Sequence, residues 1–146
     1  LWMSTLGLVL SSTDIAPLAT LSSTGTLNGG YVLSNLVDGN NATLASSVGT
    51  LPGFIFDFGA STPRNIWKLR LGLNGGTINP LACKLVYSDD GTWANTNQAA
   101  ISRALNTEIT DHLVDNYGAH RYWGLFATSG STIQFTTVEL YPRIGG

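Results

Sequence analysis

The sequence predicts an all-β protein built as an antiparallel sandwich or barrel. Short apolar runs recur along the 146 residues with turn residues between them, and helix-length periodicity is scarce. Charged residues make up only 11% of the chain, well below the roughly 25% of an average soluble domain. Neutral Ser, Thr, Asn and Gly take their place, a composition that suits strands joined by turns and leaves few residues for exposed helix faces.

Seven segments are expected to form strands. Residues 54–58 alternate, with the three phenylalanines on one face and Ile55 and Asp57 on the other. The odd-numbered residues from Trp67 to Leu73 alternate with Lys68, Arg70 and Gly72 in the same manner, so one face of each strand is core. The seven strands are Gly7–Leu10, Ala16–Leu21, Phe54–Phe58, Trp67–Leu73, Leu81–Tyr87, Arg121–Thr128 and Thr132–Tyr141.

Less regular stretches separate these strands. The segment from Thr96 to Asn116 is the least clear, and Ala99–Leu105 within it fits either a strand or a short helix. Four clusters contain residues that tolerate positive φ or cap their own backbone, and these predict turns. The turns are Asn28-Gly29-Gly30, Asp38-Gly39-Asn40-Asn41, Asn74-Gly75-Gly76 and Asp89-Asp90-Gly91.

Length and charge restrict the classes of protein that remain. The chain suits a single domain over residues 1–146, and its opening Leu-Trp-Met suggests a piece of a longer polypeptide. A formal net charge of −2 argues against nucleic acid as a partner.

The apolar stretch Leu1–Leu10 is too short for a membrane span and is expected to be a strand. The only cysteine, Cys83, is interpreted as a small buried residue.

Several motifs are more specific together than alone. They are the loop Leu36-Val37-Asp38-Gly39-Asn40-Asn41-Ala42-Thr43, the strand Ile55–Gly59, the turn Tyr87-Ser88-Asp89-Asp90-Gly91-Thr92-Trp93, the strand Arg121-Tyr122-Trp123 and the closing Val138-Glu139-Leu140-Tyr141. Their order and spacing resemble the discoidin or coagulation-factor type C domain and the similar family 32 carbohydrate-binding modules of the galactose-binding-like superfamily. The resemblance spans roughly Ala16 to Tyr141 and implies a jelly-roll β-sandwich.

The Asp38 loop has two interpretations. Ca²⁺ takes six to eight oxygens from carboxylates, hydroxyls and carbonyls in a tight turn, and Asp38, Gly39 and Thr43 offer a carboxylate, a bend and a hydroxyl. Alternatively, Asp38 caps its own backbone in an Asx turn while Glu139 is solvated. The resemblance implies a structural Ca²⁺ held by the Asn35 carbonyl, the Asp38 carboxylate, the Asn40 carbonyl, the Thr43 hydroxyl and carbonyl, the Val138 carbonyl and the Glu139 carboxylate.

The resemblance also implies a ligand site near this loop. Sugar-binding modules use an aromatic platform flanked by hydrogen-bonding side chains. In the sugar-binding relatives an aromatic residue and a polar residue, often His, follow the loop, but this chain has Leu44-Ala45-Ser46-Ser47 there. The departure puts a galactose-type pocket in doubt. The remaining candidate ligand residues are Tyr31, Arg70, Asn74 and Asn79, each of which also fits a turn or surface role.

Other motifs have structural interpretations. Asp57 should accept backbone donors at a strand end, and Arg121 should pair with nearby acids. The Asp89-Asp90-Gly91 turn fits a solvated hairpin better than a cation site, with Trp93 packed beneath it.

The sequence does not predict an enzyme. His112 and His120 are the only histidines, neither has zinc-type spacing, and no Gly-x-Ser-x-Gly elbow is present. An esterase or glycosidase is therefore the least favoured class.

Two function classes remain. The first is a non-catalytic module that binds a carbohydrate or a cell-surface glycan receptor, in a setting such as host-surface adhesion. The second is a structural or decoration domain that docks to neighbouring subunits of a phage tail or capsid. Either role places the domain outside cells or on a virion surface.

Overall fold

The computed structural model describes residues 7–40, 42–72, 82–93, 98–102 and 109–145. These residues form twelve strands and two short 3₁₀ helices. The strands are β1 Leu8–Leu10, β2 Thr20–Ser23, β3 Thr26–Leu27, β4 Ala45–Val48, β5 Gly53–Asp57, β6 Asn65–Gly72, β7 Ala82–Ser88, β8 Gln98–Ser102, β9 Ile109–Leu113, β10 Tyr122–Ala127, β11 Thr132–Phe135 and β12 Thr137–Gly145; the 3₁₀ helices are η1 Ala16–Leu18 and η2 Leu33–Leu36.

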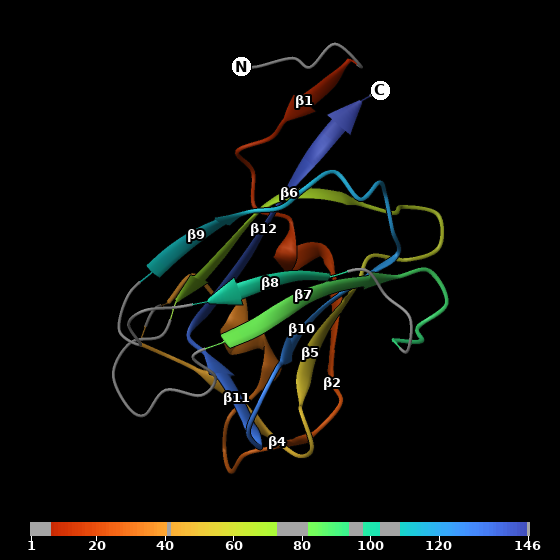
Figure 1. Ribbon diagram of the computed structural model, residues 1–146. Helices are drawn as coiled ribbons and strands as arrows, with labels where there is room; N and C mark the ends of the chain where they lie inside the picture. The colour runs from red at the N-terminus through yellow and green to blue at the C-terminus, as the bar shows by residue number, and fades with distance from the viewer. Residues whose placement is uncertain (1–6, 41, 73–81, 94–97, 103–108, 146) are drawn as a thin grey trace.

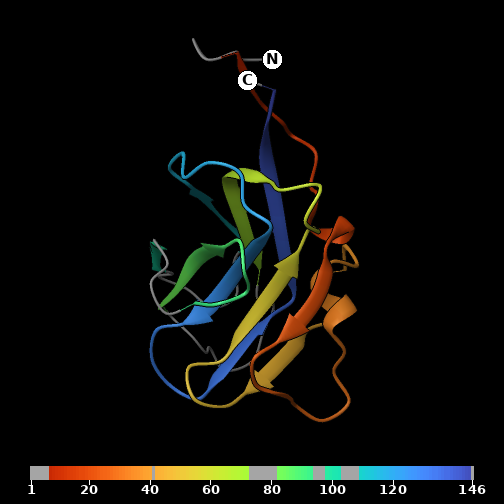
Figure 2. The same ribbon diagram turned by 90° about the vertical axis from the view of Figure 1, so that its right-hand side faces the viewer.

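The strands form three antiparallel sheets (Figures 1 and 2). One sheet has the order β1-β12-β6-β9, the second β2-β5-β10-β7-β8 and the third β11-β4-β3. A single cluster of buried side chains joins the two larger sheets, since it includes Leu69 and Leu140 from the first and Phe56 and Leu125 from the second. The predicted all-β antiparallel sandwich is therefore confirmed.

The alternation in residues 54–58 is as predicted. Phe54, Phe56 and Phe58 are buried, whereas Ile55 and Asp57 are partly exposed. On the neighbouring strand β10, Trp123 is fully buried and its indole N–H donates to the Arg64 carbonyl at 2.8 Å. These large rings form the centre of the core because a period of two places them all on one face of the sheet.

The prediction for the strand that begins at Trp67 is only partly right. Leu69 and Leu71 are buried as expected, but Ile66 is also fully buried while Trp67 is partly exposed. The register explains this. Tyr141 of β12 pairs with Lys68, and Pro142 pairs with Ile66, so Trp67 has no partner on β12. Trp67 is thus the extra residue of a β-bulge, and a bulge reverses the faces of the residues on either side of it.

Two predicted strands are wrong in their extent. Ala16–Leu18 forms the helix η1 instead of a strand, because Pro17 has no N–H for a sheet ladder. Thr132–Tyr141 is two strands in different sheets: β11 pairs with β4, and β12 pairs with β6. The chain changes sheet at the buried Thr136, whose N–H donates to the Gly72 carbonyl at 2.8 Å.

Some predictions fall on residues outside the described ranges, namely residues 1–6, 73–81 and 103–105. Within Ala99–Leu105, the part that is described belongs to the strand β8. The sequence did not predict β3, β4 or β9, although Ala45, Ser46 and Ser47 of β4 are fully buried. No helix in the described part of the chain is long and apolar enough to cross a membrane.

Smaller structural predictions are confirmed. The Arg121 guanidinium pairs with the Asp57 carboxylate through Nε and Nη2 at 2.9 and 3.1 Å. Asp57 also accepts the Gly59 N–H at 2.9 Å, and Cys83 is buried. In the Asp89-Asp90-Gly91 turn, Asp90 accepts the backbone N–H of Thr92 at 2.9 Å.

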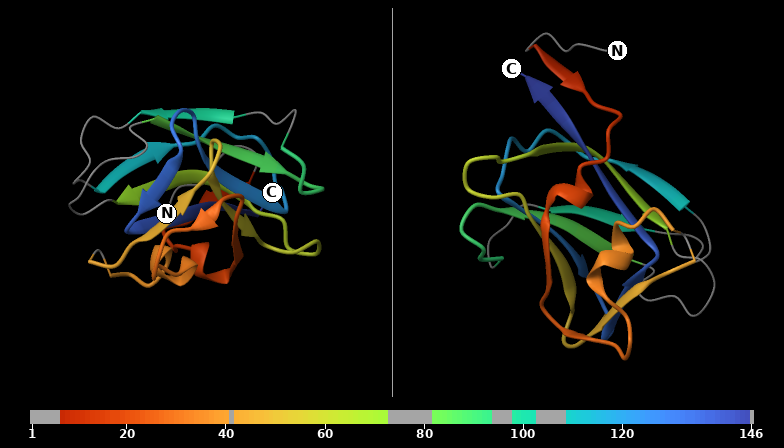
Figure 3. Two further views of the ribbon diagram at one scale, coloured as in Figure 1. Left: turned by 90° about the horizontal axis from the view of Figure 1, so that it is seen from below. Right: turned by 180° about the vertical axis from the view of Figure 1, so that it is seen from behind.

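The far end of β12 leaves the body of the sandwich. Its last residues pair with β1, from Leu8 opposite Gly145 to Leu10 opposite Arg143, and of these only Arg143 also pairs with β6. The two strands form a ribbon that projects beyond the sheets, as Figure 3 shows from behind. Ile144 is 54% exposed on this ribbon.

Gly53 supplies a test of the core. It pairs with Phe126 of β10, and a Cβ at Gly53 would lie 2.5 Å from the Phe126 ring. We expect Gly53→Ala to lower the free energy of unfolding by about 1–3 kcal/mol, because the ring must move within a packed sheet. Urea unfolding followed by tryptophan fluorescence measures this. Gly29→Ala is the control, since nothing lies within 4 Å of a Cβ there, and equal effects of the two variants would contradict the packing described.

Candidate functional site

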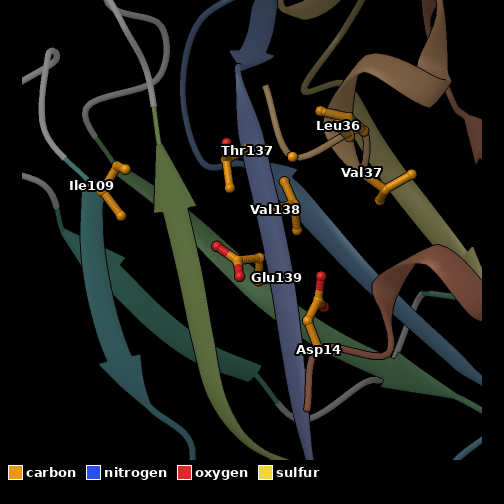
Figure 4. Close-up of a pocket in the computed structure, with 8 residues that line it drawn as sticks. Asp14, Leu36, Val37, Ile109, Thr137, Val138 and Glu139 are labelled. Carbon is orange, nitrogen blue, oxygen red and sulfur yellow. The ribbon is translucent and has the colours of Figure 1, made fainter. Parts of the chain in front are cut away.

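A hollow of about 230 Å³ lies beside β12, where this strand faces the loop after η2 (Figure 4). Acidic and hydroxyl side chains line it together with apolar ones. Its walls come from segments that are far apart in the sequence and meet only because β12 closes the first sheet. The lining residues are Asp14, Leu36, Val37, Gly39, Ile109, Thr137, Val138 and Glu139.

Asp14 holds the segment before η1 against β12. Its Oδ1 accepts the backbone N–H groups of Ala16 and Leu140, both at 2.9 Å. Burial raises the pKa of this carboxyl, and the nearby charge of Glu139 raises it further, whereas the two backbone hydrogen bonds oppose the shift. Asp14 was not among the residues predicted from the sequence. Its spacing to Ala16 could have indicated an Asx turn, but not its approach to Glu139.

Glu139 lies on the outer face of the sheet, within a network of charges. The Tyr141 hydroxyl donates to Glu139 Oε1 at 2.6 Å, and burial and this carboxylate together raise the pKa of Tyr141. Arg70 Nη1 lies 3.9 Å from Glu139 Oε2. Arg70 also forms a bidentate pair with Asp111 at 2.6 and 3.1 Å, which lowers the pKa of that carboxyl. The rim of the hollow is thus a fixed set of partly exposed charges.

The Asp38 loop is closed by its own hydrogen bonds. Asp38 Oδ1 accepts the Asn40 N–H at 2.8 Å, which is the Asx turn of the second interpretation. The Thr43 hydroxyl donates to Asp38 Oδ2 and contacts the Asn40 carbonyl at 3.1 Å. Gly39 has a φ of 71°, a backbone conformation that glycine adopts without steric cost.

This loop fits the donor chemistry of a hard cation in part. A carboxylate, a hydroxyl and a carbonyl converge in Asp38, Thr43 and Asn40, and such oxygens are the ligands that Ca²⁺ prefers. Asn35 lies in η2, directly before this loop, and its side-chain amide donates to the Leu44 carbonyl at 2.8 Å. The described residues contain no group of three or more His, Cys, Asp or Glu side chains arranged to hold a metal ion.

The remaining predicted metal ligands lie across the hollow. Val138 and Glu139 line the same cavity as Gly39. The Glu139 carboxylate extends away from this loop toward β6 (Figure 4), where Tyr141 occupies one of its oxygens. Of the predicted metal ligands, Val138 and Glu139 therefore line the hollow, whereas Asn35, Asp38, Asn40 and Thr43 do not.

The predicted sugar-binding residues are separated. Arg70 lies at the rim of the hollow through its contact with Glu139. Tyr31 is 40% exposed in the turn before η2, where its N–H donates to the Asn28 carbonyl at 3.2 Å, and it does not line the hollow. Asn74 and Asn79 lie outside the described residues.

Comparisons with known proteins place the fold. No family model matches the sequence, and no curated protein matches it. Solved structures do match. The lectin domain of lectinolysin, solved with Lewis b antigen, is 14% identical with a TM-score of 0.72, over 90% of this chain and 98% of that one. A family 32 carbohydrate-binding module of Clostridium perfringens, in complex with GalNAc-β-1,3-galactose, is 13% identical with a TM-score of 0.71, over 88% and 99%.

A fucolectin from the serum of striped bass, Morone saxatilis, is 14% identical with a TM-score of 0.75, over 94% of this chain and 50% of that chain. At such low identities these structures establish the fold alone. The chain therefore has the discoidin-like, galactose-binding-like β-sandwich fold that the motifs predicted.

The opposite pKa shifts of Asp14 and Asp57 give a testable pH dependence. Because the folded-state pKa of Asp14 is raised above its ordinary 3.8, its contribution to stability is present below 3.8 and is lost as the pH rises through the folded value. Arg121 lowers the pKa of Asp57, so its contribution is present above 3.8 and is lost as the pH falls.

We expect Asp14→Asn to gain stability relative to the parent chain as the pH rises from below 3.8 toward neutrality. Asp57→Asn should lose stability relative to the parent over the same rise. Urea unfolding at a series of pH values measures both differences. Slopes of the same sign for the two variants would contradict the assignment.

Proposed function

We propose that this chain is a non-catalytic carbohydrate-binding module and that the hollow beside β12 is its sugar site. The observation that carries the proposal is the combination of Asp14, Thr137 and Glu139 with the apolar Val37 and Ile109 in one open cavity. Carboxylates accept hydrogen bonds from sugar hydroxyls, and hydroxyl side chains both donate and accept them. Apolar side chains cover the C–H faces of a sugar ring. Similar structures solved with several different sugars give independent support.

The position of the site differs from the one that the resemblance implies. Leu44-Ala45-Ser46-Ser47 stand where the resemblance implies an aromatic and a polar ligand residue, and Ala45–Ser47 are fully buried in β4. They have no surface to offer a ligand. The hollow beside β12 borders the Asp38 loop, because Gly39 is one of its lining residues, and Arg70 contacts its Glu139.

The charge of the hollow points to a class of sugar. Asp14 and Glu139 are both acidic, whereas the guanidinium of Arg70 is bound by Asp111. An acidic sugar would be repelled there, since like charges at close range in a partly buried site destabilise each other. We propose a neutral or amino-bearing glycan as the ligand, presented on a cell surface or in an extracellular matrix.

One histidine supports the proposed lack of catalysis. The His120 ring lies between two acceptors, with Asp89 Oδ2 at 3.0 Å from Nδ1 and the Tyr117 carbonyl at 2.7 Å from Nε2. It also stacks on Tyr87 with ring centroids 3.8 Å apart. Both ring nitrogens are used to hold neighbouring segments together, which is a structural role.

A second candidate function, docking to neighbouring subunits of a larger assembly such as a phage tail or capsid, has support from another surface. Leu113 and Ile144 are 78% and 54% exposed. Together with Leu10 and Trp67 they place apolar side chains around the ribbon of β1 and β12. Exposed apolar patches of this kind occur at protein interfaces. A stable complex with a neighbouring subunit and no response to any glycan would favour this function.

A glycan array followed by titration calorimetry tests the sugar site. We expect binding to a neutral or amino-bearing glycan, and a loss of about tenfold in affinity for Glu139→Gln, because a charge-assisted hydrogen bond is replaced by a neutral one. The amide oxygen of Gln can still accept from Tyr141, so the fold is kept. Asp90→Asn is the control, since it makes the same change in a turn outside the hollow. Equal affinities of both variants would place the sugar elsewhere.

We also propose that the Asp38 loop holds a structural Ca²⁺, with Asp38, Asn40 and Thr43 as ligands and the Asn35 and Val138 carbonyls beside them. The Glu139 carboxylate, which extends toward β6 and binds Tyr141, would join this set only by turning toward the loop. Such an ion would fasten this loop to β12. Thermal unfolding with added calcium or with EDTA tests this. We expect calcium to raise the midpoint for the parent chain and for Asp90→Asn but not for Asp38→Asn, because ligand that binds only the folded state stabilises it. Identical midpoints in calcium and EDTA would overturn the proposal.

A further inference from the structure

A second hollow, of about 290 Å³, lies where the ribbon of β1 and β12 leaves the sandwich. It shares no lining residue with the hollow beside β12. Among the residues that the structure describes, two arginines line it and no carboxylate does. The lining residues are Leu8, Pro63, Arg64, Asn65, Ala119, Pro142, Arg143, Ile144 and Gly145.

Arg64 is fixed by its backbone, while its side chain lacks an acceptor. Its N–H donates to the His120 carbonyl at 2.8 Å, and its carbonyl accepts from the Trp123 indole at 2.8 Å. The Nε atom is buried without a hydrogen-bond partner. The guanidinium lies 5.7 Å from the centre of the Phe58 ring. A buried, unsatisfied donor on a charged group costs free energy, which a suitable acceptor would recover.

Arg143 adds a second positive charge to the same hollow. Its Nη1 and Nη2 donate to the carbonyls of Ile66 and Val114 at 2.7 and 2.8 Å. Carbonyls satisfy these donors without neutralising the charge. Burial lowers the pKa of Arg143, and only the charge of Asp115 opposes the shift.

Asp57 and Asp89 on neighbouring elements are already occupied by other partners, whereas the charge of Asp115 acts on Arg143. Asp57 forms its bidentate pair with Arg121. Asp89 accepts from His120 at 3.0 Å and from the Arg121 N–H at 3.2 Å. Neither carboxylate forms an ion pair with Arg64 among the described residues.

We propose that the hollow between Arg64 and Arg143 binds a small oxyanion, a sulfate or carboxylate group, with the guanidinium of Arg64 as the principal donor. A guanidinium presents neighbouring N–H groups in a planar fork that matches two oxygens of such a group. Arg143 supplies charge from the other wall. This site is independent of the site proposed beside β12, whose ligand is a neutral or amino-bearing glycan and not an anion.

Nuclear magnetic resonance of the full chain tests the proposal. Sodium sulfate and sodium glucuronate are titrated separately at constant ionic strength, with glucose as the neutral comparison. We expect a saturable shift of the Arg64 Nε–H signal and of the amide signals of Asn65 and Ala119 with sulfate, with glucuronate or with both. Glucose should cause none. Binding of either anion supports the proposal, and the pair distinguishes a free inorganic ion from an acidic sugar as the source.

Arg64→Met is the decisive variant, since it keeps the backbone hydrogen bonds and the apolar stem of the side chain. We expect it to weaken anion binding by about tenfold or more, because it removes a charge-assisted hydrogen bond. Lys84→Gln removes the same charge from β7, outside this hollow, and should bind as the parent does. The absence of saturable shifts with both anions, or equal shifts in Arg64→Met and the parent, would overturn the proposal. This test and the glycan-binding test at Glu139 can succeed or fail separately, because the two hollows share no lining residue.

Discussion

The pairing of β12 is the constraint on which the rest of the structure depends. This strand forms a long antiparallel ladder with β6 along one edge. Along its other edge Leu140 bonds to Asp14 and Ile15, and further along the strand pairs with β1. The last strand of the chain is thereby locked between an early segment and the middle of the sequence, while Val138 and Leu140 enter the core. Both hollows lie along this strand, one near its beginning and one near its end.

The two hollows differ in charge because β12 meets different neighbours along its length. Near Glu139 it faces Asp14, and both side chains are acidic. Near Arg143 it faces the residues before β6, which bring Arg64. A chain with a net charge of only −2 thus separates its charges into an acidic site and a basic site. Local electrostatics, more than net charge, determines which ligands each can accept.

Bulges and turns position the site as much as the strands do. The extra residue Trp67 in β6 keeps Lys68 and Arg70 on the outer face beside Tyr141, where Lys68 Nζ lies 4.3 Å from the centre of the tyrosine ring. A regular ladder would have kept Trp67 on the same face as Leu69. The Asp38 turn places Gly39 in the wall of the hollow. Local irregularity thus forms a polar surface on an apolar scaffold.

The sequence by itself determined the features that depend on neighbouring residues. The alternation of Phe54, Phe56 and Phe58, the Asx turn at Asp38 and the order of the motifs were sufficient to predict the sandwich, because a period of two and turn chemistry act over a few residues. Tertiary structure alone decided which distant residues meet. The split of Thr132–Tyr141 between two sheets, the bulge at Trp67, and the meetings of Asp14 with Glu139 and of Arg64 with Arg143 all follow from strand register. Register is set by packing between strands that are far apart in the chain, and no local pattern in the sequence records it.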